Sequence, residues 1–333
     1  MKHSNIPIFI PELACPHQCV FCNQAKISGT QNIPSPSSIS AIIETYLSTM
    51  NDGREVEVAF FGGSFTGLPI ELQEEYLANV YPYYESGRIS GIRLSTRPDY
   101  ISQTILDLLK RYGVKTIELG AQSTHVEVLS ASGRGHDREA IWRASELIRQ
   151  NDFHLGLQMM IGLPKDSFER SSQTVDDIIS LGADNTRIYP TLVIKGTALG
   201  RLYETGRYTP LDLHTAVSWS KEFFLRFERA GVTVLRVGLH PSEELSSNKS
   251  LLAGPYHPSF KELVMTEIWR EILASRLSAY NNERLTLVVH PSQINFVYGY
   301  ERKNRELFDQ KRLEVKVVGN FNFGKYEIEV SRC

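Results

Sequence analysis

The sequence predicts an α/β fold, a partial (β/α)6 TIM-like barrel followed by a small C-terminal α+β extension. Three observations support this prediction. Short apolar runs alternate with amphipathic helical segments six times, and a seventh apolar run follows. Such alternation implies a parallel sheet with right-handed crossovers. Six units are fewer than the eight that close a barrel, so a partial barrel is expected. Polar or glycine residues follow nearly every strand, and ligands bind at the strand ends in this architecture.

The elements of the barrel can be placed in chain order from hydrophobic periodicity and from helix caps and stops. Strands are expected at 6–10, 55–61, 91–95, 115–119, 154–161, 185–190 and 232–237. Helices are expected from Ser37 or Ser38 to Met50 and at 69–85, 101–112, 138–150, 167–181 and 211–230. A proline near the first turn, as at Pro69, and a glycine after the last, as at Gly113, are typical of helix ends.

A polar stretch at 242–250 indicates a loop or a domain edge. The expected division is therefore a core at 1–240 and a C-terminal α+β module at 241–333. Within this module a helix is expected at 260–276 and a charged helix at 300–311. Strands at 285–290, 313–318 and 326–330 are expected to form a mostly antiparallel sheet.

Composition limits the classes of function. The chain has 333 residues, of which 41% are hydrophobic and 22% charged, with a net charge of −2. This balance gives no general attraction for nucleic acid. No apolar run approaches the roughly 18 residues of a membrane helix, and the N-terminus has no apolar signal-peptide region. Clustered thiols suit a reducing compartment, so a cytoplasmic protein without a membrane partner is expected.

Three of the four cysteines, Cys15, Cys19 and Cys22, fall in one C-x3-C-x2-C stretch after the first strand. A [4Fe–4S] cluster normally takes four thiolates, so three would leave one iron open to a small molecule. Zinc is an alternative, but its usual second Cys or His pair does not follow. Three cysteines cannot all pair in disulfides, and cysteines without a ligand remain the third interpretation. Nothing suggests a second cluster at Cys333.

Several other residues at strand ends could face a ligand. A glycine pair after the second strand would let backbone approach a ligand closely, and Glu118 is a lone carboxylate in an apolar strand that must be paired or hydrogen-bonded if buried. Arg187 and Arg236 could bind anions or form structural ion pairs, and His240 could line a cavity or simply end a turn. The candidate ligand-binding residues are Gly62, Gly63, Ser95, Arg97, Gln122, Gln158 and Arg187. The sequence identifies no catalytic side chain.

The cysteine motif, with Phe21 before its third cysteine, resembles the signature of the radical S-adenosylmethionine (radical SAM) superfamily. The resemblance implies that Cys15, Cys19 and Cys22 hold a [4Fe–4S] cluster whose open iron chelates S-adenosylmethionine (SAM). Reductive cleavage then yields methionine and a 5′-deoxyadenosyl radical, which abstracts hydrogen from the substrate. Gly62 and Gly63 resemble the family's GGE motif, which contacts the methionine amino group through its backbone, although Ser64 stands in place of the acidic residue. An external reductant of the flavodoxin or ferredoxin type is implied.

Longer phrases narrow the resemblance to the Elp3 branch over about residues 6–240. They are STRPDYI at 95–101, ELGAQS at 118–123, and YPTLVIKGTAL followed by YETGRY within 189–208. Elp3 modifies wobble uridines in tRNA, and related bacterial proteins are grouped with oxygen-independent coproporphyrinogen oxidases. About 95 residues follow residue 238, without an obvious acetyl-CoA pyrophosphate loop, so this chain is not expected to perform the complete Elp3 reaction alone. The expected activity is therefore radical SAM chemistry on a nucleoside of tRNA or another RNA. The alternatives are a small metabolite such as a tetrapyrrole, or a cluster-bearing redox protein.

Overall fold

The computed structural model describes residues 2–10, 19–23, 33–50, 54–240, 245 and 249–333. Its largest feature is a seven-stranded sheet in the order β1-β2-β3-β4-β5-β6-β8, with every neighbouring pair parallel. The strands are β1 (Lys2–Ile10), β2 (Arg54–Gly62), β3 (Gly91–Thr96), β4 (Val114–Gln122), β5 (His154–Ile161), β6 (Asn185–Pro190) and β8 (Thr233–Val237). The half-barrel predicted from the alternating pattern is confirmed.

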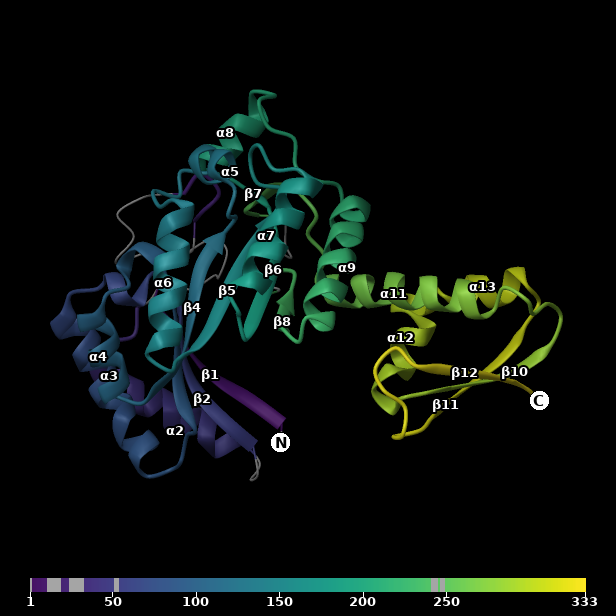
Figure 1. Cartoon of the computed structure of the whole chain (residues 1–333), viewed down its shortest axis with the longest axis horizontal. Helices are drawn as coiled ribbons and strands as arrows, with labels where there is room; N and C mark the ends of the chain where they lie inside the picture. The colour runs from purple at the N-terminus through teal and green to yellow at the C-terminus, as the bar shows by residue number, and fades with distance from the viewer. Residues whose placement is uncertain (1, 11–18, 24–32, 51–53, 241–244, 246–248) are drawn as a thin grey trace.

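Helices connect successive strands and cover one face of this sheet (Figure 1). They are α2 (Ile39–Thr49), α3 (Ile70–Glu85), α4 (Gln103–Arg111), α6 (Arg138–Gln150), α7 (Phe168–Ser180) and α9 (Leu213–Arg229). Short turns of 3-10 helix precede three of them, η1 (Pro36–Ser38), η2 (Phe65–Gly67) and η3 (Pro98–Tyr100). None of the described helices is long and apolar enough to cross a membrane.

Side-chain caps fix where several of these helices begin. Ser102, Asp137, Ser167 and Asp212 each accept a hydrogen bond from the backbone three residues on, and the shortest is the 2.8 Å bond from Ala140 N to Asp137. Each cap satisfies a backbone N–H that the first turn cannot. These caps fix the first residue of each helix. They therefore also fix where the strand-to-helix loops end at the carboxyl edge of the sheet.

Three smaller elements at that edge were not predicted. They are α5 (Val126–Ala131), α8 (Ala198–Glu204) and the two-residue strand β7 (Val193–Ile194), which pairs antiparallel with β9 (Leu251–Ala253). Each is too short to produce a clear periodic pattern. Figure 1 shows α5, α8 and β7 together beyond the carboxyl ends of the strands.

The C-terminal part consists of helices packed on a three-stranded sheet with the order β11-β10-β12. Its elements are α11 (Phe260–Arg276), β10 (Arg284–Val289), η4 (Pro291–Gln293), α12 (Ile294–Tyr298), η5 (Tyr300–Arg302), α13 (Arg305–Gln310), β11 (Glu314–Gly319) and β12 (Ile328–Arg332). The expectation of a mostly antiparallel sheet was wrong, because β10 pairs parallel with β11 and antiparallel only with β12. The connection through α12 and α13 is a crossover, which parallel neighbours require.

The single charged helix expected at 300–311 is also wrong. Glu301 and Arg302 have φ angles of 51° and 61°, which an α-helix does not allow. Contacts with α11 explain the break: Tyr300 N donates to Thr266 Oγ1 at 2.7 Å, and Asn304 Nδ2 donates to Thr266 O at 3.2 Å. These tertiary hydrogen bonds override the helical pattern of the charged residues.

Helix α11 belongs to two hydrophobic cores. Phe260, Val264 and Ile268 pack in the core between the large sheet and its helices. Trp269 and Leu273 pack instead with the small C-terminal sheet. Figure 1 shows α11 leading from the half-barrel to that sheet.

Candidate active site

A cavity of about 880 Å³ lies at the carboxyl ends of the half-barrel strands. Nine of the ten residues predicted to bind a ligand or cluster line it: Cys19, Cys22, Gly62, Gly63, Ser95, Arg97, Gln122, Gln158 and Arg187. The tenth, Cys15, lies outside the described residues. Among the residues described, no group of three His, Cys, Asp or Glu side chains could hold a metal ion. The structure describes two of the three motif cysteines, Cys19 and Cys22, and both line the cavity.

Backbone hydrogen bonds hold the described part of the cysteine segment against two loops. Val20 N donates to Ser132 O at 3.1 Å, and Leu199 N donates to Val20 O at 2.7 Å. Cys22 N donates to Cys19 O at 3.0 Å, which closes a tight turn. Both thiols therefore belong to a segment anchored to the loops after β4 and β7.

Arg134 is a residue of this site that sequence reasoning missed. Its side chain is buried in the cavity wall, and Nη1 lies 3.1 Å from Cys19 Sγ. Nη2 donates to Gly120 O, which ties the guanidinium to β4. Gly133 and Gly135 on either side have positive φ angles, and this glycine-flanked arginine was the signal available in the sequence.

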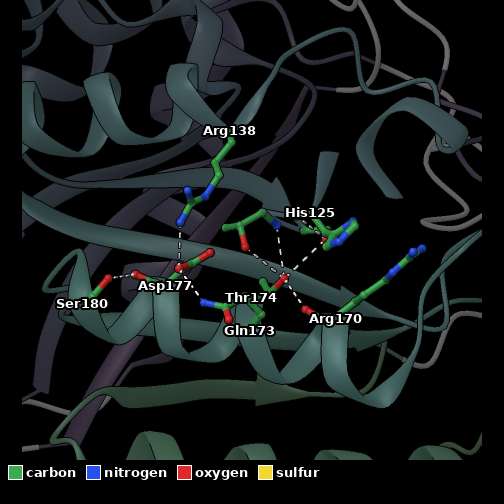
Figure 2. A network of polar contacts seen from close by, with 9 residues as sticks. His125, Arg138, Arg170, Gln173, Thr174, Asp177 and Ser180 are labelled. Atoms are coloured by element: carbon green, nitrogen blue, oxygen red, sulfur yellow. Dashed lines mark hydrogen bonds and ion pairs between the residues drawn. The ribbon is translucent and has the colours of Figure 1, made fainter. Parts of the chain in front are cut away.

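A polar network on α7 holds the loop that leads from β4 to Arg134 (Figure 2). Thr174 Oγ1 accepts from Thr124 N at 3.2 Å and donates to Arg170 O at 3.1 Å. His125 N donates to Ser123 Oγ at 3.1 Å, which orders the residues before α5. One turn further along α7, Asp177 accepts from Arg138 at the start of α6. Helix α7 thus fixes both ends of the segment that carries Arg134.

The glycine pair after β2 is held close to β1. Gly62 has a φ of 109°, and a Cβ atom there would lie 2.7 Å from Ile10 O. Gly63 N donates to that same oxygen at 2.7 Å. The close approach predicted for this pair is therefore to the first strand, and a Gly63 contact to a ligand would use its carbonyl group.

Glu118 joins several predicted residues on the inner face of the sheet. Its carboxylate is fully buried and accepts from Arg187 Nε at 2.6 Å and Nη2 at 3.0 Å. Gln158 Nε2 lies 3.2 Å from the same carboxylate and 3.3 Å from Ser95 Oγ. Burial alone would raise the pKa of Glu118, but the charge and hydrogen bonds of Arg187, together with the charge of Arg93 and the hydrogen bond of Gln158, outweigh burial and hold that pKa below its usual value.

These contacts extend into a row of alternating charges across the half-barrel. Arg93 Nε lies 3.2 Å from Glu57 Oε2 and 3.6 Å from Glu118 Oε1. Glu57, Arg93, Glu118 and Arg187 thus balance two negative and two positive charges, and only Arg187 lines the cavity. Buried charges are tolerated when they are paired. Arg187 is therefore both an ion-pair partner of Glu118 and a residue that lines the cavity.

Arg97 is likewise engaged with a carboxylate. Its Nε and Nη2 donate to Asp99 at 2.9 and 2.8 Å. His136 Nδ1 lies 3.9 Å from Asp99, and neither ring nitrogen has a side-chain partner among the described residues. Burial, followed by the charges of Arg134 and Arg97, lowers the pKa of His136 to about 3, so the imidazole is neutral at working pH.

Gln122 ends β4 in a strained conformation. Its φ is 66°, and the pairing of β4 with β5 shifts register between Gly120 and Gln122. The side-chain oxygen Oε1 is buried without a hydrogen-bond partner in the described structure. An unsatisfied buried acceptor is costly, which makes this oxygen a candidate to accept a hydrogen bond from a ligand in the cavity.

The chain matches two family models. The Radical SAM superfamily model matches residues 10–178, and the Radical_SAM C-terminal domain model matches residues 183–270. The first covers half of the chain, from the last residue of β1 through the cysteine segment and into α7. The chain belongs to the radical SAM superfamily.

Curated relatives place the chain near Elp3. Elongator complex protein 3 of Saccharomyces cerevisiae is 31% identical over 183 residues, which are 49% of this chain and 33% of that protein. Protein YhcC of Escherichia coli is 28% identical, with 59% of this chain and 63% of that protein covered. The radical SAM protein described here thus spans well under half of the yeast relative, and the homology to Elp3 is confined to the radical SAM region.

Among solved structures, Elp3 from Methanocaldococcus infernus matches with a TM-score of 0.60 at 19% identity. The match covers 81% of this chain and 63% of that one. At this identity the likeness concerns the fold, and it supports the half-barrel architecture.

Members of the radical SAM superfamily use a [4Fe–4S] cluster and SAM, and the site fits both. Two soft thiol donors stand at the cavity wall, which suits iron–sulfur chemistry. A guanidinium faces Cys19 and would offset the negative charge of a thiolate-bound cluster. No carboxylate is found among the described lining residues, so the anionic carboxylate of SAM meets no like charge there.

Proposed function

We propose that this radical SAM enzyme acts on a nucleoside of tRNA or another RNA. The observation that carries the proposal is the combination of Elp3-like sequence with one cavity that contains both cysteines and the strand-end polar residues. A volume of about 880 Å³ is near the top of the usual range for ligand sites, about 300–1,000 Å³. That leaves room for a nucleoside beside SAM.

In this proposal Cys15, Cys19 and Cys22 hold the cluster. The backbone of Gly62 and Gly63 lies beside the methionyl group, and Gln122 Oε1 accepts a hydrogen bond from SAM or substrate. Ser95 and Gln158 contact the cofactor from β3 and β5. Arg97 and Arg187 act differently: each is already bidentate to a carboxylate. Arg97 holds a fixed position at the cofactor end of the cavity, and Arg187 holds one in the wall at the β6 end.

The cofactors supply a 5′-deoxyadenosyl radical that abstracts hydrogen, and the chain's own residues orient the partners and exclude water. Phe9, Phe61, Met160, Leu192 and Ile194 form apolar walls around the polar residues. These walls help to exclude water from the space where the radical forms. Superfamily members need a reductant, and we propose a small protein donor of the flavodoxin or ferredoxin type.

The direct test is product formation without oxygen. Reconstituted enzyme with dithionite and SAM should release 5′-deoxyadenosine, Cys22→Ala should release none, and Cys333→Ala, whose exposed thiol lies beside Thr286 in the C-terminal sheet, should match wild type. No product from a fully loaded wild-type cluster, even with bulk tRNA, would contradict the proposal.

A second measurement addresses the substrate. A phosphate-binding protein loses RNA affinity steeply as salt rises. Stimulation of SAM cleavage by bulk tRNA, together with salt-sensitive binding, would support an RNA substrate. Stimulation by a metabolite extract alone would instead favour the small-molecule alternative.

A further inference from the structure

The arginines that line the cavity differ in whether another group of the protein pairs with their charge. Four arginines line it, Arg97, Arg134, Arg187 and Arg236, and the described lining includes no Asp or Glu. Arg97 is paired with Asp99 and Arg187 with Glu118. Arg134 faces Cys19 and the carbonyl of Gly120. Three of the four guanidinium groups are thus committed within the protein or at the cluster.

Arg236 differs from these three. It lies on β8, directly opposite Arg187 in the parallel ladder, and Gln158 occupies the same level on β5. No ion pair or hydrogen bond joins its side chain to another residue of the described structure, although it is partly buried. Since Glu118 already neutralises Arg187, it leaves Arg236 as the excess cation at this level. A partly buried cation without a partner is unfavourable, and an anionic ligand would remove that cost.

The position of Arg236 in the sheet separates it from the cofactor end of the cavity. The glycine pair proposed for the methionyl group ends β2, and β8 lies five strand spacings away. At about 4.8 Å per spacing this is roughly 24 Å along the curved sheet. In the proposed arrangement SAM lies near β2 and the cysteines, so a substrate anion is a closer match to Arg236 than the carboxylate of SAM. His240, which follows β8, lines the same end of the cavity and adds a second hydrogen-bonding group.

We propose that Arg236, with His240 at the rim, forms a phosphate subsite for the substrate nucleotide. The inference rests on the proposed RNA function and specifies which part of the substrate this end of the cavity binds. A guanidinium presents parallel N–H donors that match two phosphate oxygens. The phosphate next to the target nucleoside would be fixed at β8, and the base or ribose would extend toward SAM.

The test uses reconstituted holoenzyme and bulk tRNA, with binding measured at several KCl concentrations. Arg236→Gln removes the charge, Arg236→Lys restores it without the planar fork, and Arg229→Gln is the matched control. Arg229 is exposed at the end of α9, on the opposite edge of the sheet from the cavity. Arg236→Gln should weaken binding on the order of tenfold at low salt and reduce the slope of log K against log[salt] by about 0.7. Arg236→Lys should keep the slope and lose part of the affinity, and Arg229→Gln should bind as wild type.

Two further readouts separate the possible failures. Unchanged tRNA affinity and slope in Arg236→Gln would overturn the subsite and leave the RNA function standing. Weaker SAM binding by Arg236→Gln would also overturn it, because the arginine would then serve the cofactor.

If wild type binds no tRNA, the RNA function fails. The phosphate subsite is then tested by comparing the affinity of the enzyme for nucleoside 5′-monophosphates with its affinity for the matching nucleosides. A preference for the monophosphate that Arg236→Gln abolishes would retain a phosphate subsite for a small substrate. Equal affinities would overturn it.

Discussion

The contact between Arg134 and Cys19 gives one side chain influence over the cluster. Cys19 is a proposed cluster ligand, and a cation and N–H donor 3.1 Å from its sulfur would stabilise the extra electron of the reduced cluster, since hydrogen bonds and charge near the sulfurs tune its potential. Arg134→Gln should therefore lower the midpoint potential, by about 50 mV for a loss of about 1.2 kcal/mol. Potentiometric titration followed by electron paramagnetic resonance measures this shift. Arg143→Gln, an arginine on α6 that does not line the cavity, is the control, and an equal potential in both variants would contradict the role of Arg134.

The buried imidazole of His136 makes stability depend on pH. Its pKa is lowered to about 3 in the folded chain against about 6.5 unfolded, so the unfolded state binds the extra proton between these values. Stability is therefore full above about pH 6.5 and falls as the pH drops toward 3. Between pH 7 and pH 5 the wild-type chain should lose about 2 kcal/mol more than His136→Gln.

Urea unfolding of the chain without its cluster measures this difference, because a bound cofactor breaks two-state behaviour. A measurement at pH 8, where the imidazole is neutral in both states, provides the baseline. Equal losses in the two proteins between pH 7 and pH 5 would show that His136 is not the buried neutral group.

At the level of single elements, the end of β2 depends on Gly62. Any side chain there must adopt a φ of 109° and place Cβ 2.7 Å from Ile10 O. Gly62→Ala should cost about 1–3 kcal/mol in strain and displace β1 just before the cysteine segment. Gly87→Ala is the control, because its φ is also positive at 73° but no atom lies within 4 Å of the added Cβ. The urea midpoint should fall further for Gly62→Ala, and equal midpoints would contradict the close approach.

Four elements were predicted to the residue, and other long helices, such as α9, to within one or two residues at each end. Helices α6 and α11 and strands β5 and β6 have the expected bounds, because periodicity, caps and stops act locally there. The helix expected at 300–311 failed because Thr266, more than thirty residues earlier, determines that segment. Likewise, sequence placed Glu118 inside an apolar strand and Arg187 toward the end of another, but their pairing across 69 residues required the fold. Arg134 was missed for the same reason, since its partner Cys19 is 115 residues away.

On the scale of the whole molecule, the division into 1–240 and 241–333 remains a proposal. Phe260, Val264 and Ile268 of α11 complete the core of the half-barrel. A chain ending at residue 240 exposes the surfaces of α9 and β8 that these side chains cover. We expect it to aggregate or bind hydrophobic dyes, whereas the full chain should not. Cooperative unfolding of a soluble 1–240 chain would show instead that the division separates independent folding units.

The continuity of α11 also sets a length. Its 17 residues rise about 1.5 Å each, so the helix is about 25 Å long, and its two halves set the separation between the half-barrel core and the C-terminal core. Since one end is packed in each core, that separation is fixed and the two parts cannot swing independently. Under the proposed RNA function, a stem that extends beyond the cavity would meet this fixed sheet, whereas a metabolite enclosed in the cavity would not. The helix would then make the physical extent of a substrate, and not only its chemistry, a property that this protein discriminates.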